Sequence, residues 1–293
     1  MPSWQGKSKG TPLGYRIFVA VLRKGGLSPA YWLLRFVALY YFIFSRATSR
    51  AILDFFRHRM GMGPWTAWKK LYRNYYLFGQ SLIDRVAVMS GAGQSLTFDF
   101  DGEQHLREIT AMQRGGLLLS AHIGNWEIAG HLLKRLGTPI HIVMYDGEHQ
   151  QIKQYLDSVT GQRNVSIIVI RDSLSHIYEI SEALRKNELV CMHADRFLEG
   201  NKTLEATFLG KPALFPMGPF VLASKFKVPV CFVFALKETK LHYHFFSSPV
   251  HEYKDLSKET GIRMALEDFI VETEAKVRQY PEQWYNYYNF WKA

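Results

Sequence analysis

The chain contains only two cysteines among its 293 residues, Cys191 and Cys231, and both lie inside apolar runs. Cysteines in such positions are usually small core residues, and two of them make no disulfide framework, which favours a reducing compartment. Intrinsic disorder is excluded too, because 47% of the residues are hydrophobic and 15% are aromatic. The composition therefore indicates a folded protein with a sizeable core.

Several common catalytic and metal-binding motifs are missing. The chain has no G-x-S-x-G, no Gly-rich phosphate loop, and neither H-E-x-x-H nor C-x-x-C. No metal site and no bound cofactor are therefore predicted. Scattered histidines such as His131, His141, His149 and His193 are expected to be structural.

Acidic residues are almost absent from the first 60 positions. Asp54 is the single one there, against ten basic residues, and most of the net charge of +10 comes from this segment. Such asymmetry points to a segment that meets a polyanion, either nucleic acid or an anionic membrane surface.

The apolar residues within this segment favour the membrane. The run "AYWLLRFVALYYFIF" (residues 30–44) would span about 22 Å as a helix, short of the roughly 30 Å hydrocarbon core. Tyr31, Trp32, Tyr40 and Tyr41 have amphipathic rings that settle at a headgroup boundary. We therefore expect residues 1–60 to form membrane-docking helices and expect no nucleic-acid partner. The alternative is an aromatic-rich core helix packed on the main domain.

From residue 61 onward the pattern predicts a single α/β domain, residues 61–293. Apolar strands such as "LTFDFDG", "LLLSA", "PIHIVMY", "VSIIVI" and "ELVCMHA" alternate with predicted helices. Two further strands, "VPVCFVFAL" and "LHYHFFSS", precede the closing helix "GIRMALEDFIVETEAKVRQY". This alternation predicts a largely parallel central sheet flanked by helices.

Polar side chains follow the predicted strands where chemistry collects in such sheets. His122 comes after "LLLSA", and Asp195 comes after "LVCMHA". Asn125 is expected to cap the next helix, which puts Glu127 in its first turn. A carboxylate there can hold one imidazole nitrogen and leave the other as a general base. The alternative for His122 is a hydrogen-bonded structural histidine beside a strand.

The stretch "SAHIGNWE" is similar to the H-x4-[DE] active-site block of the lysophospholipid acyltransferase superfamily. Its context looks most like the bacterial late acyltransferases of lipid A biosynthesis, of the lauroyl and myristoyl type. "HADRFLEG" and the following "ATFLGKPALFPMGPFVLASKFKVPVCFVF" resemble the second block of that family, and "YPEQWYNYYNFW" resembles its carboxyl-terminal tail. The resemblance covers most of the chain in the right order.

The resemblance implies transfer of a fatty acyl group from a thioester, carried by acyl-carrier protein or by coenzyme A, to a hydroxyl of a lipid or glycolipid. It places the protein at the cytoplasmic face of the bacterial inner membrane, and no secretory signal peptide contradicts that, since "IFVAVL" is too short for one. By the same resemblance His122 is the base and Glu127 its orienting acid.

Residues of the second block are implied to bind substrate. Asp195 and Arg196 belong to it, and Gly218 leads its helix, while Asn125 comes from the first block. Arg196 is expected to contact the donor or a phosphate, and the alternative is a structural salt bridge with Asp195. Lipid A members usually lack this arginine and carry another where Asp146 stands here.

These departures leave the acceptor open between a lipid A precursor, a polyene lipid, an aminolipid and a lysophospholipid. Two rival functions use the same residues differently. A thioesterase or lipid hydrolase would pass the acyl group to water, and a non-catalytic membrane-binding module would not need His122 at all.

Overall fold

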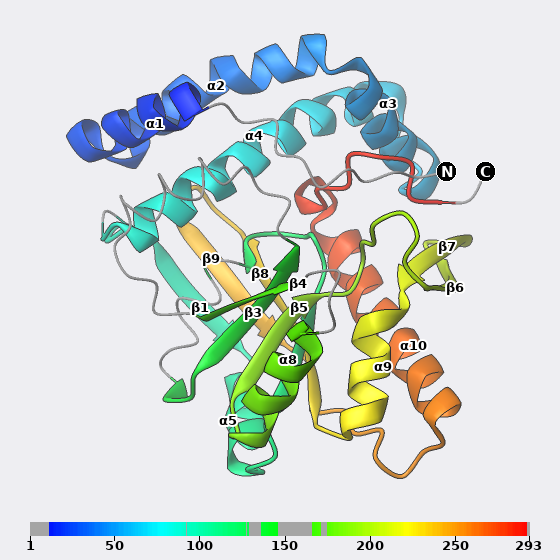
Figure 1. The fold of residues 1–293 in the computed structure, drawn as a ribbon. Helices are drawn as coiled ribbons and strands as arrows, with labels where there is room; N and C mark the ends of the chain where they lie inside the picture. The colour runs from blue at the N-terminus through cyan, green and yellow to red at the C-terminus, as the bar shows by residue number, and fades with distance from the viewer. Residues whose placement is uncertain are drawn as a thin grey trace.

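The computed structural model describes residues 12–91, 93–126, 128, 136–145, 166–170 and 175–291. Its main sheet is built from β1 (Thr97–Asp101), β2 (Gly116–Ser120), β3 (Ile140–Tyr145), β4 (Ser166–Ile170), β5 (Leu189–His193), β8 (Val230–Lys237) and β9 (His242–Ser247). The strand order is β1-β9-β8-β2-β5-β3-β4, and all neighbours run parallel except β8 and β9 (Figure 1). The predicted α/β fold with a largely parallel sheet is confirmed.

Strand β2 lies at the centre of the sheet and is buried along its whole length. Leu117 and Leu119 belong to one hydrophobic cluster, and Leu118 between them belongs to another. Successive side chains of a strand point to opposite faces, so both faces of β2 are covered. Such a strand reads as an unbroken apolar run, which is why "LLLSA" could be recognised in the sequence.

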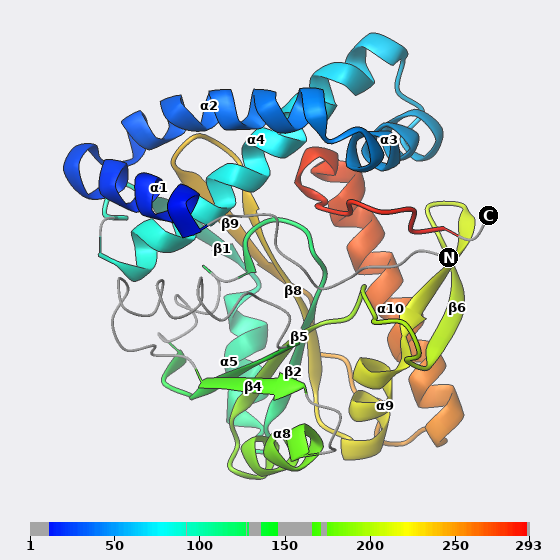
Figure 2. The same ribbon diagram turned by 45° about the horizontal axis from the view of Figure 1, so that its top comes forward.

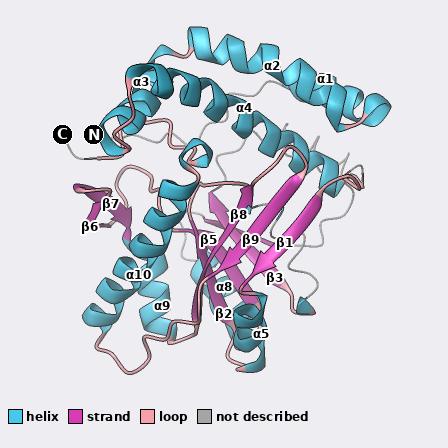
Figure 3. Cartoon of the chain, turned by 180° about the vertical axis from the view of Figure 1, so that it is seen from behind, coloured by secondary structure: helices cyan, strands magenta, loops and turns pink. Residues whose placement is uncertain are grey.

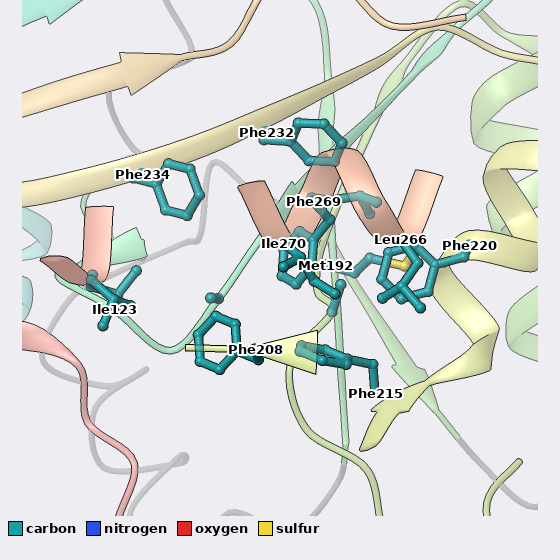
Figure 4. Close-up of a cluster of buried hydrophobic side chains, with 14 of the residues drawn as sticks. Ile123, Met192, Phe208, Phe215, Phe220, Phe232, Phe234, Leu266, Phe269 and Ile270 are labelled. Atoms are coloured by element: carbon teal, nitrogen blue, oxygen red, sulfur yellow. The ribbon is translucent and has the colours of Figure 1, made fainter. Parts of the chain in front are cut away.

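Helices cover these faces. The helices are α5 (Glu103–Ala111), α8 (Ser175–Arg185), α9 (Met217–Phe226) and α10 (Lys258–Gln279). Ile109 of α5 shares a cluster with Leu118. On the other face, Phe232 of β8 packs against Phe269 of α10, with 5.9 Å between the ring centroids (Figure 4). Further expected helices, "HQQIKQYLDSVTG" and most of "WEIAGHLLKRLG", lie outside the described residues.

A β-hairpin that the sequence patterns did not predict stands beside α9 and α10 (Figure 2). Strands β6 (Thr203–Phe208) and β7 (Lys211–Pro216) pair antiparallel across the two-residue turn Leu209-Gly210. Both turn residues have positive φ, 49° and 80°, as the hairpin-favouring type I′ turn requires. Asparagine or aspartate usually occupies the first of these positions. Because leucine stands there instead, the sequence carries no recognisable turn motif.

The N-terminal part of the chain folds as α1 (Pro12–Gly25), α2 (Leu27–Phe44), α3 (Arg46–Asp54) and a π-helical turn (Phe55–Arg59), followed by the long α4 (Pro64–Met89). Helix α2 lies along α4, at the top of the sheet (Figures 1 and 3). Their close approach depends on Gly79, because a Cβ there would sit 2.3 Å from Cδ1 of Leu34.

Helix α2 has two apolar faces with different surroundings. One face is buried and consists of Leu27, Ala30, Tyr31, Leu34 and Ala38. The other is exposed and carries Trp32, Phe36, Leu39, Tyr40, Ile43 and Phe44. At 18 residues and a mean hydropathy of 1.3, α2 has the length and composition of a possible membrane span, although 28% of it is buried against the rest of the protein.

Candidate active site

Strand register brings His122 and Asp195 together. Strands β2 and β5 are parallel neighbours, and Ser120 at the end of one pairs with His193 at the end of the other. His122 and Asp195 each follow two residues after that pair, so they leave the sheet side by side at the same edge. Among the described residues, β3, β4, α8 (Ser175–Arg185) and β5 separate the two residues along the chain.

Asp195 holds His122 through two hydrogen bonds. The backbone N–H of His122 donates to Oδ2 of Asp195 at 2.9 Å, and Nδ1 of the imidazole lies 2.7 Å from Oδ1. The Asp195 side chain is 3% exposed and that of His122 is 23% exposed. The carboxylate therefore fixes the ring from inside the protein while the ring keeps an open side towards solvent.

The electrostatics of this pair favour a neutral His122 imidazole and a charged Asp195 carboxylate. Burial lowers the pKa of His122, and the positive charge of Arg196 lowers it further, against the opposing effect of Asp195. Burial alone would raise the pKa of Asp195, but the interactions with His122 and Arg196 outweigh it and hold that pKa below its usual range. A neutral imidazole oriented by a carboxylate is suited to accept a proton at neutral pH.

Glu127, the predicted orienting acid, lies outside the described residues. Asn125 is placed just before the first helical residue, Trp126, as expected for a helix start. Its side-chain amide is turned inward, where it donates to the backbone carbonyl of Ser81 at 2.8 Å and to the hydroxyl of Tyr243 at 3.3 Å. Asn125 therefore anchors the segment that carries His122 to the protein interior.

Arg196 does not form the alternative salt bridge with Asp195 among the described residues. Its guanidinium donates instead to the backbone carbonyl of Tyr285 and lies 5.9 Å from the ring centroid of Tyr288. Its Nε is buried without a hydrogen-bond partner in the described part of the chain. Arg196 is thus held by the carboxyl-terminal tail and acts on His122 through its charge.

Gly218, predicted to bind substrate, is the second residue of α9 and is exposed. A Cβ at this position would meet no atom within 4 Å. The surface there is open, and Gly218 is not in contact with His122 or Asp195 through any hydrogen bond or ion pair between described residues.

The second imidazole of the site, His193, was expected to be structural. Its ring centroid lies 3.9 Å from that of His122 and 4.8 Å from that of Trp126. Burial, together with the charges of His122 and Arg196, holds the pKa of His193 well below its usual value. Its Nε2 is buried with no hydrogen-bond partner among the described residues. His193 is the last residue of the strand "LVCMH", two residues before the predicted site residue Asp195, and this position could have identified it as a residue of the site.

A small cavity of about 30 Å³ adjoins His193 and Trp126. Its walls come from residues of β2, β3, β5 and β8 and are mostly apolar, including Leu118, Ile142 and Val233. No group of three or more histidine, cysteine or acidic side chains gathers to hold a metal ion anywhere in the described ranges.

The fold and the site define an α/β protein whose histidine–carboxylate pair stands at the carboxyl ends of the central strands, without a serine nucleophile motif. A model of the bacterial lipid A biosynthesis acyltransferase family matches residues 71–293. The chain belongs to that family. The resemblance drawn from the three sequence blocks is confirmed.

Curated relatives match a shorter stretch. The phosphatidylinositol mannoside acyltransferase of Mycobacterium tuberculosis strain ATCC 25618 / H37Rv is 31% identical over 127 residues, and that of strain CDC 1551 / Oshkosh is 30% identical. The match covers 42% of this chain and 39% of either relative, so it spans about two fifths of their length.

Among solved structures, the 1-acyl-sn-glycerophosphate (LPA) acyltransferase of Thermotoga maritima is similar. It is 13% identical with a TM-score of 0.39, over 85% of this chain and 94% of that one.

Proposed function

We propose that this protein transfers a fatty acyl group from a thioester to a hydroxyl of a membrane lipid. The observation that carries the proposal is the His122–Asp195 pair, with 2.7 Å between Nδ1 and Oδ1, at the carboxyl edge of the sheet. Membership of a family named for lipid A acyl transfer supports the same reaction.

In the proposed mechanism His122 acts as the general base. Asp195 holds the Nδ1–H tautomer, which leaves Nε2 to accept the proton of the acceptor hydroxyl. The hydroxyl oxygen attacks the thioester carbonyl, the C–S bond breaks, and the proton passes from the imidazole to the leaving thiolate. The products are an ester and a free thiol. A neutral imidazole has one N–H to donate, so Glu127 is proposed as the orienting acid only in place of Asp195, at Nδ1.

The donor and acceptor are inferred from the relatives. We propose acyl-carrier protein as the donor carrier, with coenzyme A as the other candidate. The family name refers to lipid A, and the curated relatives are named for phosphatidylinositol mannoside. Both acceptors are glycolipids, which favours a sugar hydroxyl of a membrane glycolipid over the polyene lipid, aminolipid and lysophospholipid alternatives.

We also propose that the protein docks on an anionic membrane, at the cytoplasmic face of the bacterial inner membrane. The exposed face of α2 supports this, since Trp32, Phe36 and Tyr40 are each more than half exposed. Helix α4 adds Trp65 and Trp68, which are 82% and 47% exposed and lie beyond the segment that the sequence assigned to docking. Aromatic rings at such density suit a headgroup boundary.

A basic groove continues this aromatic surface. It has a volume of about 510 Å³, and Phe42, Trp68, Arg46, Arg50 and Arg57 contribute to its lining. Within the described part of the chain none of these three arginines pairs with an acid. Unpaired arginines beside exposed aromatic rings match the negative potential of an anionic leaflet, to which each basic residue near the surface adds about 1 kcal/mol.

The test is a reconstituted reaction. Purified protein is given acyl-carrier-protein thioester with detergent-dispersed glycolipid, and products are followed by mass spectrometry. We expect acylated glycolipid and free carrier thiol in equal amounts. A matched reaction without acceptor should release thiol only slowly. Rapid release of free fatty acid in that second reaction would instead indicate a thioesterase, and no thiol release in either would remove the enzymatic proposal.

A further inference from the structure

The acyl transfer proposed above requires His122 to stay in place, and the structure suggests how the protein achieves this. We propose that a buried polar network positions the His122 loop (residues 121–125), with Tyr243 and Tyr31 as positioning residues that tie the loop to helices α4 and α2. The inference rests on the proposed function and concerns residues that do not touch the reacting atoms.

The backbone of the His122 loop is bonded from two sides. On one side lies the carboxyl-terminal tail, whose Tyr285 N–H donates to the carbonyl of His122 at 2.9 Å. The tail also accepts, through the carbonyl of Gln283, from the N–H of Gly124 at 2.9 Å. On the other side the N–H of Asn125 donates to the carbonyl of Ala235 in β8 at 2.7 Å.

Gly124 allows the His122 loop to approach β8 closely enough for these hydrogen bonds. Its φ is +69°, and a Cβ on it would lie 2.0 Å from the carbonyl oxygen of Ala235. Any other residue would push the loop away from β8 or strain the backbone. The motif "HIGN" thus has a structural reason for its glycine beside the chemical reason for its histidine.

The tail is itself fastened to β8 by Gln283. The N–H of Lys237 donates to Oε1 of this side chain, and its Nε2 donates to the carbonyl of Lys237, both at 2.8 Å. Gln283 is 4% exposed, so these bonds are shielded from water. The "PEQW" part of the tail therefore serves the site without reaching it.

Asn125 connects the loop to the interior. Its amide donates to the carbonyl of Ser81 in α4 and to the hydroxyl of Tyr243 in β9. That hydroxyl in turn donates to Oδ2 of Asp84 at 2.5 Å. Asp84 is fully buried on α4, so it is the anionic centre of the network.

Two further groups satisfy Asp84. The ammonium of Lys237 lies 2.5 Å from Oδ2, and the hydroxyl of Tyr31 on α2 donates to Oδ1. Lys237 Nζ also donates to the Tyr31 hydroxyl at 3.1 Å. A buried ion pair contributes little net stability against well-packed apolar residues, and in some proteins it is kept because it fixes one arrangement. Here the arrangement it fixes includes the His122 loop.

The polar groups of this network are bonded to one another, so removal of one of them is expected to move the His122 loop. Misplacement of a catalytic group by 1 Å can cost roughly a hundredfold in rate. Loss of one link should move His122 by less than that. We therefore expect a fall in kcat of roughly three- to tenfold for a lost hydroxyl, with KM almost unchanged, because the network lies behind the site.

The test compares two Tyr→Phe variants of the full-length protein. Tyr243→Phe removes the hydroxyl between Asn125 and Asp84. Tyr253→Phe removes a hydroxyl that donates to the partly exposed Asp268 at 2.8 Å, at the opposite end of the sheet, from a tyrosine that is itself 2% exposed. Each variant loses one carboxylate-bonded hydroxyl, and circular dichroism should show that both remain folded at the assay temperature. Only Tyr243→Phe should lose kcat.

Tyr31→Phe extends the test to α2 and replaces Tyr243→Phe if that protein does not fold. It should lower kcat in the same range and leave vesicle binding unchanged, because Tyr31 is only 2% exposed. Wild-type kcat in Tyr243→Phe, or in Tyr31→Phe where Tyr243→Phe does not fold, would overturn the positioning role. An inactive wild type would instead overturn the proposed function, so the two failures are distinguishable.

Discussion

His122 is fixed by its neighbours before any substrate arrives. Its N–H and its Nδ1 both bond to the Asp195 carboxylate, and its carbonyl accepts from the tail. Rotation of the ring would break a charge-assisted hydrogen bond, which is roughly twice as strong as a neutral one. The imidazole is therefore preorganised in one orientation.

Asp195→Asn should lower the rate of acyl transfer by about 10²- to 10⁴-fold. The amide keeps the shape of the side chain but loses its charge and no longer selects one imidazole tautomer. The measurement is steady-state turnover of the thioester with glycolipid present. Asp268→Asn is a matched control, since Asp268 also pairs with a histidine, His251, at 3.1 Å far from the site. Equal activity in the two variants would contradict the role of Asp195.

Arg196 should shift the acid limb of the pH–rate profile, which arises from protonation of His122; burial lowers the pKa of this imidazole most, and the charge of Arg196 lowers it further. The base works in its neutral form, and its pKa is lowered below the ordinary value of about 6.5, so activity should fall only below that pH. Arg196→Gln removes a positive charge that lowers this pKa, and the limb should move to higher pH. Arg196→Lys keeps the charge, and its limb should stay near that of wild type. Profiles of kcat/KM for the three proteins decide the matter, and three superimposable acid limbs would refute the electrostatic role.

At the scale of helices and strands, some features of the fold could be predicted from the sequence and others could not. Strand β2 and its neighbours were recognisable because buried parallel strands are apolar throughout. The partner of His122 was not, because β2 and β5 are neighbours in the sheet but not in the chain. Sequence order alone therefore did not show that Asp195 would meet His122.

The buried network and the hairpin escaped prediction for related reasons. Asp84 lies in the last two turns of the long aromatic helix α4, where nothing local marks it as the partner of Lys237. Leu209 takes a positive φ that leucine seldom adopts, and it is stabilised by burial. In both cases tertiary contacts override the local preference of the residue.

The exposed face of α2, together with the start of α4, should carry membrane binding. Replacing Trp32, Phe36 and Trp65 by serine should weaken binding to anionic vesicles at least tenfold, since each large side chain withdrawn from water contributes about 1.5–3 kcal/mol. Vesicle sedimentation measures this. Tyr178→Ser, at an exposed position of α8, is the control and should bind as wild type does. Unchanged binding of the triple variant would mean that this face does not dock.

For the molecule as a whole, the division between residues 1–60 and 61–293 stays a prediction. Helix α2 covers α4 and brings Tyr31 to Asp84, so the two parts share a packed interface. Deleting residues 1–60 should leave only weak vesicle binding, since Trp65 and Trp68 of α4 remain, and should also lower the stability of the remaining domain. Each buried leucine lost from the interface, such as Leu34, contributes about 1.5–3 kcal/mol.

Circular dichroism and thermal unfolding of residues 61–293 test this expectation. A folded domain with a clearly lower unfolding temperature is the predicted result. A domain as stable as the full chain would show that the N-terminal helices contribute nothing to the fold.

The central claim is that His122 is the base of an acyl transfer, and one substitution tests it most directly. The rate of glycolipid acylation by His122→Ala should fall by about 10²- to 10⁴-fold, as expected for loss of a general base. Its circular dichroism spectrum and vesicle binding should match those of wild type, because the ring lies at the edge of the sheet. Retention of more than about a tenth of the wild-type rate would contradict the account.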